Sequence, residues 1–344
     1  MNPIGIVFDP ECLLHDTGPG HAESSARLQC LLNMLGAHDV QALSPTILHG
    51  RSATEAEVLR VHSPAHWKRL KATAGYNVRL DNDTVASPRS FDAALRSAGC
   101  TLAAVEAVVA GEVRSAFAFT RPPGHHAEPD KPMGFCLFNN VAIAARHARA
   151  TLGMQRIAIV DFDVHHGNGT QNTFYHDPYV LYVSTHQRPL YPGTGAATEL
   201  GEGLGRGRTI NIPLRGGHGD AEFDAIYGSV VARILERFRP DLIIVSAGFD
   251  IAAEDPLGSM EVSSDGFARI AAHLVAAAEM TCGGRIVFAL EGGYSLMALQ
   301  DGVFACLEAM AGVVQVGEPR GSLATLPLGD AVQYLDLYRE FFPI

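Results

Sequence analysis

The sequence predicts an α/β fold in which helices cover both faces of a mainly parallel central sheet. Apolar runs without alternation are typical of strands buried on both faces, and longer stretches of helical periodicity lie between such runs here. Strands that alternate with helices form βαβ units with right-handed crossovers, so a three-layer α/β/α architecture is expected. The predicted strands are 116–120, 157–160, 180–184, 242–245 and 286–290.

The helices are predicted from apolar periodicity and from the residues that cap them. A capping-box pattern at Thr54 and Glu57 marks the start of a short helix near the N-terminus. Gly111, Gly153 and Gly283 follow three of the longer predicted helices, in the position of C-terminal stops. Those longer helices are expected over 91–110, 138–152, 221–238 and 265–280.

The glycine-rich segment 193–207 is expected to form a surface loop that leads into a further strand at 209–212. Its glycine spacing is similar to that of a nucleotide-binding fingerprint, but that fingerprint connects a strand directly to a helix. A nucleotide-binding role for this loop is therefore not expected.

Composition indicates a globular protein with an acidic surface. The chain has 344 residues, and 26 Lys and Arg against 37 Asp and Glu give a net charge of −11. Phosphate contacts need clustered Lys and Arg, and no run of either occurs, so nucleic acid is not an expected partner. An acidic field would instead attract cationic substrates. No export signal is recognised and no uncharged apolar run reaches the ~18 residues of a membrane span, so no membrane contact is expected.

Cysteine usage predicts a reducing compartment, and a cytoplasmic location is expected. The cysteines contain no CxxC pair, so neither a disulfide framework nor a cysteine-based zinc site is predicted. The six residues are Cys12, Cys30, Cys100, Cys136, Cys282 and Cys306.

Ionisable side chains follow four of the predicted strands. The segments after these strands read RPPGHH, DFDVHHGNG, SAGFD and EGGY. Because open parallel sheets form their ligand crevices at the carboxyl ends of the strands, we expect one site built from all four segments. The contributing segments run from about residue 121 to 294, which favours a single catalytic domain over 1–344 against the two domains that length alone suggests.

Asp163, His165 and Asp250 form a candidate metal-ligand set. Asp163 and His165 are two residues apart at a strand end and project to the same side in extended geometry, while Asp250 arrives from another strand. Three nitrogen and oxygen donors with an open position for water are typical of catalytic zinc, although Fe(II) or Co(II) also fits such donors.

His125 and His126 need partners for their ring nitrogens. Asp161 and Asn168 flank the candidate ligands, and each could accept an Nδ1 proton and leave Nε2 free to act. A carboxylate partner raises a histidine pKa and an amide partner does not, so the two imidazoles could divide the acid and base roles. Tyr294, in a Gly-Gly turn, is positioned to donate to a developing oxyanion.

At these residues the sequence closely resembles the zinc-dependent histone deacetylase and acetylpolyamine amidohydrolase family, which has the arginase-like α/β fold. The resemblance extends over about residues 50 to 310, and HHGNGTQ with Asn168 is similar to the class II branch and its bacterial deacetylase-like amidohydrolase relatives. The matching motifs are RPPGHHA (121–127), MGFCLFNN (133–140), DFDVHHGNGTQ (161–171), SAGFD (246–250), DPLG (255–258) and EGGY (291–294).

The resemblance implies a role for each site residue. It assigns Zn(II) to Asp163, His165 and Asp250, and it makes His126 the general base and later the acid. It makes His125 an electrostatic partner oriented by Asp161, and Tyr294 the group that polarises the carbonyl. It also implies structural potassium, K(I), at one site with Asp161, the backbones of Asp163 and His165, Ser184 and Thr185, and at a second with Phe174, Asp177 and Val180. The implied walls of the acyl-lysine tunnel are Gly134, Phe135, Tyr191 and Leu257.

Three departures from the family pattern affect substrate access. Tyr191 stands where relatives usually have Phe, so a hydroxyl borders the tunnel. The loop GHAESSAR differs from the usual HPE pattern, so the tunnel rim near His21, Glu23 and Arg27 is expected to differ. Leu257 occupies the position of the glutamate found in the polyamine-specific branch, which disfavours a polyamine substrate.

The expected function is removal of acetyl or other short acyl groups from lysine side chains of proteins or peptides. Within the family, an acetylpolyamine amidohydrolase is the alternative. A two-metal manganese ureohydrolase would need further carboxylate ligands, and an inactive binding module would be expected to lack a ligand or Tyr294. A homo-oligomer is compatible with the sequence.

Overall fold

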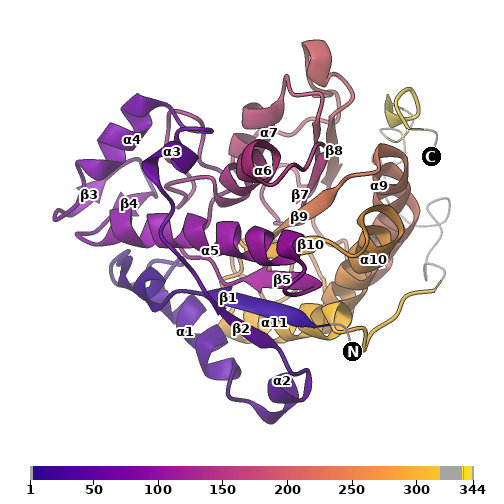
Figure 1. Ribbon diagram of the computed structural model, residues 1–344, viewed down its shortest axis with the longest axis horizontal. Helices are drawn as coiled ribbons and strands as arrows, with labels where there is room; N and C mark the ends of the chain where they lie inside the picture. Colours follow the sequence, from indigo (N-terminus) through magenta and orange to yellow (C-terminus); the bar gives the residue numbers. More distant parts are fainter. Residues whose placement is uncertain (1–2, 318–334, 336, 343–344) are drawn as a thin grey trace.

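A parallel eight-stranded sheet forms the centre of the molecule (Figure 1). The structure is a computed structural model, and it describes residues 3–317, 335 and 337–342. The strand order is β2-β1-β5-β10-β9-β6-β7-β8, and every neighbouring pair is parallel. The strands are β1 (Ile4–Phe8), β2 (Thr46–His49), β5 (Ser115–Ala118), β6 (Ile157–Asp161), β7 (Val180–Gln187), β8 (Thr209–Leu214), β9 (Leu242–Ala247) and β10 (Ile286–Leu290). A separate hairpin pairs β3 (Val78–Arg79) with β4 (Val85–Ala86).

Helices cover the sheet, which confirms the predicted α/β class. Helices α5 and α6 pack against each other and against strands β5 and β6, whereas α10 and α11 pack together and α10 contacts β9. In Figure 1 α5 lies in front of the sheet. The longer helices are α1 (Ser25–Met34), α4 (Pro64–Lys71), α5 (Ser90–Ala110), α6 (Asn140–Thr151), α10 (Ser264–Cys282) and α11 (Leu296–Met310). The shorter ones are α2 (His38–Ala42), α3 (Glu55–Val58), α7 (Asn168–Phe174), α8 (Asp220–Ile226) and α9 (Ala232–Phe238).

The predicted elements are present, with differences in their bounds. The helix expected over 221–238 contains a π-helical turn at Tyr227–Val231, so it is divided into α8 and α9. The capping box at Thr54 and Glu57 is formed, and Gly283 ends α10 in the left-handed conformation. Strands β1 and β2 were not predicted. β1 lies inside the sheet between β2 and β5, where its glycine, Gly5, faces Val113 and Leu48 closely.

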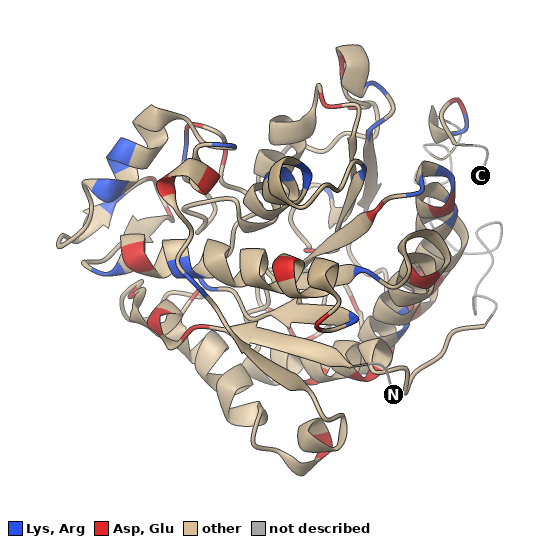
Figure 2. Ribbon diagram, viewed as in Figure 1, with Lys and Arg blue, Asp and Glu red and all other residues tan. Residues whose placement is uncertain are grey.

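Helix α5 is the one described helix that is long and apolar enough to cross a membrane. It nevertheless carries Asp92, Arg96 and Glu106, and 72% of its most apolar window is buried inside the fold. Its apolar composition is therefore explained by packing in the core. Charged residues of both signs are interspersed over the helices and loops, while the strands of the large sheet are largely uncharged (Figure 2).

His62, which precedes α4, is a buried histidine with a defined proton position. Its Nδ1 lies 3.0 Å from the Glu128 carbonyl oxygen, and its Nε2 accepts a hydrogen bond from the Asn139 amide at 2.9 Å. A proton on Nε2 would face the Asn139 N–H, so the neutral ring fits and the imidazolium does not. Burial lowers the pKa of His62 to about 3, and the neighbouring His66 lowers it further.

We expect His62 to make the protein less stable in mild acid. Because its pKa is about 3 in the folded state and 6.5 in the unfolded chain, the unfolded state binds the additional proton as the pH falls below 6.5. Between pH 7 and pH 5 this costs about 2 kcal/mol of unfolding free energy. Urea unfolding of His62→Gln should therefore show a pH-dependent loss about 2 kcal/mol smaller than that of the unmodified protein.

The control for this measurement is His38→Gln, because the His38 side chain is 97% exposed. That variant should retain the full pH dependence. An identical pH dependence in His62→Gln would contradict the assignment of this effect to His62.

Candidate metal centre and substrate pocket

The candidate metal ligands meet at the carboxyl ends of two neighbouring strands. β6 ends at Asp161, and Asp163 and His165 follow it; Asp250 follows β9, which pairs with β6 in register. His165 Nδ1 lies 3.1 Å from Asp163 Oδ1 and 3.1 Å from Asp250 Oδ2. All three residues are buried. The sequence separates these residues by up to 87 positions, and parallel pairing of β6 with β9 brings them together.

This arrangement fits a tetrahedral metal ion. Donor atoms bound to zinc at 2.0–2.1 Å in tetrahedral geometry are about 3.3 Å apart, close to the distances here. Among the described residues neither carboxylate forms an ion pair with Arg or Lys. Buried carboxylates of this kind are normally paired or coordinate a metal, so a divalent cation would balance the two negative charges.

Main-chain amides orient the two ligand carboxylates. Gly292 N donates to Asp163 Oδ2 at 2.8 Å, and Val164 N donates to Asp250 Oδ1 at 2.8 Å. A Cβ atom on Gly292 would lie 2.2 Å from Asp250 Oδ2, which is too close for any side chain. The EGGY segment therefore requires glycine at this position so that its backbone can reach the ligands.

The two histidines have the partners that the sequence suggested. His125 Nδ1 lies 3.1 Å from Asp161 Oδ2, and His126 Nδ1 lies 2.8 Å from Asn168 Oδ1. Burial by itself would lower the pKa of His125, but the carboxylates of Asp163 and Asp161 raise it to about 10. Burial lowers the pKa of His126 well below its ordinary value, and the adjacent His125 lowers it further. The neighbouring groups therefore shift the pKa values of the two imidazoles in opposite directions.

A pocket of about 290 Å³ leads to this group. Its walls are mainly apolar or aromatic, and they include the four residues expected to line a tunnel. Asp83 and Leu190 also line the pocket and were not predicted, because the turn that carries Asp83 has no chemical motif. The lining residues are Asp83, His126, Gly134, Phe135, His165, Leu190, Tyr191, Leu257 and Tyr294.

The Asp255 carboxylate fixes the backbone around Tyr294. It accepts hydrogen bonds from the amides of Tyr294 at 2.6 Å, Ser295 at 3.2 Å and Leu257 at 2.9 Å. In the sequence Asp255 belongs to the DPLG motif, and no role was predicted for it. Its contacts indicate a positioning residue that links the tunnel wall to the tyrosine.

Gly134 lies directly beside the ring of His126. Its φ is +56°, and a Cβ there would lie 2.4 Å from His126 Cδ2. We expect Gly134→Ala to displace the His126 ring and to reduce kcat by roughly 10²-fold, because misplacement of about 1 Å has effects of that size. Metal content measured by atomic absorption should stay at the unmodified level, and unchanged kcat would contradict the close contact.

The segment expected at the tunnel rim is largely buried, which corrects that prediction for Glu23 and Arg27. Arg27 donates to the carbonyl oxygens of Gly293 and Glu291, each at 2.6 Å, and its guanidinium lies 5.0 Å from the Tyr294 ring centre. Glu23 pairs with Arg121 at 2.8 Å and with Arg27. These charges are buried because they satisfy one another and the EGGY backbone.

His21 does lie near the pocket. Its ring contacts Phe135, with ring centres 4.8 Å apart, and its Nε2 is 3.1 Å from the Asp83 carbonyl oxygen. The prediction that the tunnel rim differs from that of other family members therefore stays a prediction, and of the three residues it concerns His21 alone.

The residues of the first predicted potassium site lie close together. Asp161 pairs in register with Ser184, and Thr185 follows Ser184 in β7. The Ser184 hydroxyl is 2.9 Å from His186 Nδ1, and the Thr185 hydroxyl is 2.9 Å from the Tyr227 hydroxyl. Because these hydroxyls have protein partners, an ion there would depend strongly on main-chain oxygens.

The second predicted potassium group lies around the end of α7 and the start of β7. Phe174 and Val180 are buried, and the Asp177 carboxylate pairs with Arg149 at 3.0 Å and with Arg146. Its side chain is thus neutralised by arginines. Both potassium sites stay predictions.

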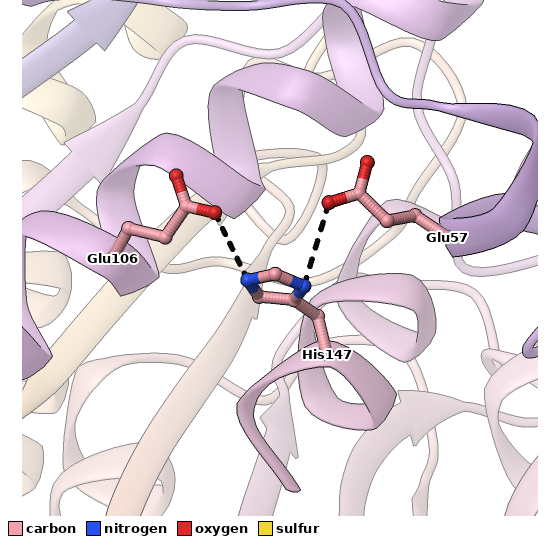
Figure 3. Close-up of side chains that lie close together, drawn as sticks. All are labelled: Glu57, Glu106 and His147. Atoms are coloured by element: carbon pink, nitrogen blue, oxygen red, sulfur yellow. Dashed lines mark ion pairs between the residues drawn. The ribbon is translucent and has the colours of Figure 1, made fainter. Parts of the chain in front are cut away.

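A second group of potential ligands is formed by Glu57, Glu106 and His147 (Figure 3). His147 lies between the two carboxylates, with its Nε2 2.9 Å from Glu106 and its Nδ1 3.4 Å from Glu57. Arg51 also pairs with both carboxylates, at 2.6 Å and 2.7 Å. Because an arginine already neutralises them, this group is a structural ion-pair network that joins α3, α5 and α6.

Comparisons with known proteins identify the family. A model of the histone deacetylase domain matches residues 21–310. The probable deacetylase of Archaeoglobus fulgidus is 40% identical over 94% of this chain and 90% of its own length. The histone deacetylase-like amidohydrolase of Pseudomonas aeruginosa is 41% identical over 90% of this chain and 86% of its own length. The solved HDA15 HD domain superposes with a TM-score of 0.92 at 36% identity, covering 99% of this chain and 96% of that domain. This chain therefore belongs to the histone deacetylase family of hydrolases.

Proposed function

We propose that this protein is a zinc-dependent amidohydrolase that removes acetyl or other short acyl groups from lysine side chains of proteins or peptides. One observation carries the proposal: Asp163, His165 and Asp250 converge beside a mainly apolar pocket that His126 and Tyr294 also line. The family membership supports the same reaction class.

Asp163, His165 and Asp250 would bind the zinc ion. When bound, the ion supplies Lewis-acid chemistry, which polarises the amide carbonyl and lowers the pKa of water. Because Asn168 interacts with Nδ1 of His126, Nε2 is the nitrogen left to accept a proton from the attacking water. His126 would then give that proton to the departing lysine nitrogen, so a carboxylate and a free amine are formed.

Tyr294 and His125 would stabilise the charge that develops during this reaction. The Tyr294 hydroxyl would donate a hydrogen bond to the tetrahedral oxyanion. His125, paired with Asp161, would keep its proton and place a fixed positive charge beside His126. Asp161 also accepts a hydrogen bond from Tyr182 at 3.0 Å, so its orientation is fixed from two sides.

The pocket lining favours an acyl-lysine substrate, and an acetylpolyamine is the alternative. Phe135, Leu190, Tyr191 and Leu257 offer apolar contacts to the alkyl chain of lysine. An acetylpolyamine is the second candidate, because the Asp83 carboxylate in the lining could pair with its distal ammonium group.

Turnover by the zinc-loaded protein tests the proposal. Acetyl-, propionyl- and butyryl-lysine peptides should be hydrolysed with a larger kcat/KM than acetylputrescine and acetylspermidine. Leu257→Glu would add a carboxylate to the pocket and should shift the preference toward the polyamines. A larger kcat/KM for polyamines in the unmodified protein would select the second candidate, and no turnover of either class would contradict both.

A further inference from the structure

A second pocket lies at the opposite end of the sheet from the metal ligands. Three of its residues directly precede neighbouring parallel strands: Arg156 precedes β6, Tyr179 precedes β7 and Arg208 precedes β8. The metal ligands instead follow β6 and β9. The pocket has a volume of about 580 Å³, within the range of small-molecule sites. Its lining residues are Arg156, Pro178, Tyr179, Leu204, Arg208, Arg237, Phe238, Phe341 and Phe342.

This pocket combines three arginines with aromatic walls and has no acidic residue among its described lining. Figure 2 shows blue segments in the loop before β8 and on α9. The loop contains Arg206 and Arg208, and α9 contains Arg233 and Arg237. Such a concentration of positive charge is unusual on a chain with a net charge of −11. The aromatic and aliphatic walls are partly open to solvent, since Tyr179 is 50% and Leu204 81% exposed.

Arg208 is a half-buried cation without a carboxylate partner among the described residues. Its Nε donates to the Pro178 carbonyl oxygen at 3.1 Å, and its guanidinium lies 5.5 Å from the Phe238 ring centre. Burial lowers the pKa of Arg208, and none of the described carboxylates opposes this effect. Two other partly buried arginines do have carboxylate partners: Arg51 pairs with two glutamates and Arg146 with Asp177.

The other two arginines of the pocket resemble Arg208 in this respect. Neither Arg156 nor Arg237 forms an ion pair with a described residue, and Asp241 accepts hydrogen bonds from the main-chain amides of Gln155 and Arg156. Three guanidinium groups surround one cavity with no carboxylate paired to them in the described part of the chain. Such a group is complementary to a phosphate, which arginine binds through paired N–H donors. The rings of Tyr179, Phe238 and Phe341, each of which already has an arginine over it, add aromatic surface for a flat group attached to that phosphate.

We propose that this pocket binds an organic phosphate with an aromatic group, of the nucleotide class, at a site separate from the hydrolytic centre. Arginine side chains would bind the phosphate. The glycine-rich segment 193–207, whose spacing is similar to a nucleotide-binding fingerprint, has no part in this proposal. β6 connects the two ends of the sheet, with the pocket before its first residue and Asp163 and His165 after its last.

Isothermal titration calorimetry on the zinc-loaded protein tests the proposal, with ADP as the probe. ADP should bind. Adenosine and pyrophosphate should each bind at least about tenfold more weakly, because adenosine lacks the phosphate and pyrophosphate lacks the aromatic group. Arg208→Gln and Arg237→Gln should each weaken ADP binding about tenfold or more. Circular dichroism should show near-native melting for Arg237→Gln, whose side chain is exposed.

Arg233→Gln is the matched control, because it removes the same charge from the exposed face of α9 outside the pocket lining. It should bind ADP as the unmodified protein does. Equal ADP affinity in Arg208→Gln, Arg237→Gln and Arg233→Gln would overturn the proposal, and so would the absence of ADP binding at millimolar concentration.

Discussion

Asp250→Asn is expected to lose the bound metal and to reduce kcat/KM for acetyl-lysine peptides by roughly 10³-fold or more, because water is no longer activated in the site. Asparagine has nearly the shape of aspartate but no charge, and its amide group cannot supply two acceptor oxygens. Asp250 uses both oxygens: Oδ1 accepts from Val164 N, and Oδ2 lies 3.1 Å from His165 Nδ1. The substitution therefore removes one negative charge from the ligand set.

Metal content and activity should be measured on the same preparations. Glu254→Gln is the control, since Glu254 is an exposed carboxylate four residues away in the sequence. That variant should keep both metal and turnover. If Asp250→Asn retained stoichiometric zinc with normal kcat/KM, Asp250 could not be a ligand that the reaction needs.

The centre of this site could be predicted from the sequence because the end of each strand can be recognised from the residues of that strand alone. Apolar runs locate β6, β9 and β10, and parallel pairing then requires that the residues after them meet at one edge. Hydrogen-bonding requirements indicated Asp161 and Asn168 as candidate partners of the two histidines, and the family resemblance assigned Asp161 to His125. Ligand, base and tyrosine could therefore be placed near one another without knowledge of the order of strands in the sheet.

The sequence did not predict which charged residues are buried. Glu23 and Arg27 were placed near the rim because their loop, GHAESSAR, departs from the family's HPE pattern, and charged side chains of this kind are usually exposed. In the structure they are buried because Arg121 pairs with Glu23, while Arg27 donates to the carbonyls of the EGGY segment. The partners that neutralise or accept from these buried charges are about 100 and 265 positions away in the sequence, and only the fold brings them together.

The N-terminal strands were missed for a related reason. β1 is a short run interrupted by Gly5, and a strand of this kind has too few side chains to produce a clear pattern. Its place inside the sheet depends on β5 and β2 on either side. Similarly, Asp83 reaches the pocket because the β3–β4 hairpin packs near Phe135, whose amide donates to the Thr84 hydroxyl at 3.1 Å.

Tyr294→Phe is expected to reduce kcat about 100-fold or more while leaving the metal content unchanged, because loss of one oxyanion donor has effects of this size. The phenylalanine ring would retain the packing of Tyr294 against Phe135, whose ring centre is 5.9 Å away, and against Arg27. Asp255 would still accept a hydrogen bond from the main-chain amide of residue 294. Only the hydroxyl is lost, so the variant should fold normally.

Tyr191→Phe is the control for Tyr294→Phe. It removes a hydroxyl from the same pocket without removing the proposed oxyanion donor. Tyr191 lines the same pocket, and its ring packs edge-on against His126 with ring centres 5.1 Å apart. Because Tyr191 lines the pocket proposed to bind the substrate, removal of its hydroxyl should change KM more than kcat. A hydroxyl that stabilises only the transition state should show the opposite pattern, with a reduced kcat and little change in KM. Equal kcat losses in the two variants would mean that the pocket, and not the Tyr294 hydroxyl, controls the chemical step.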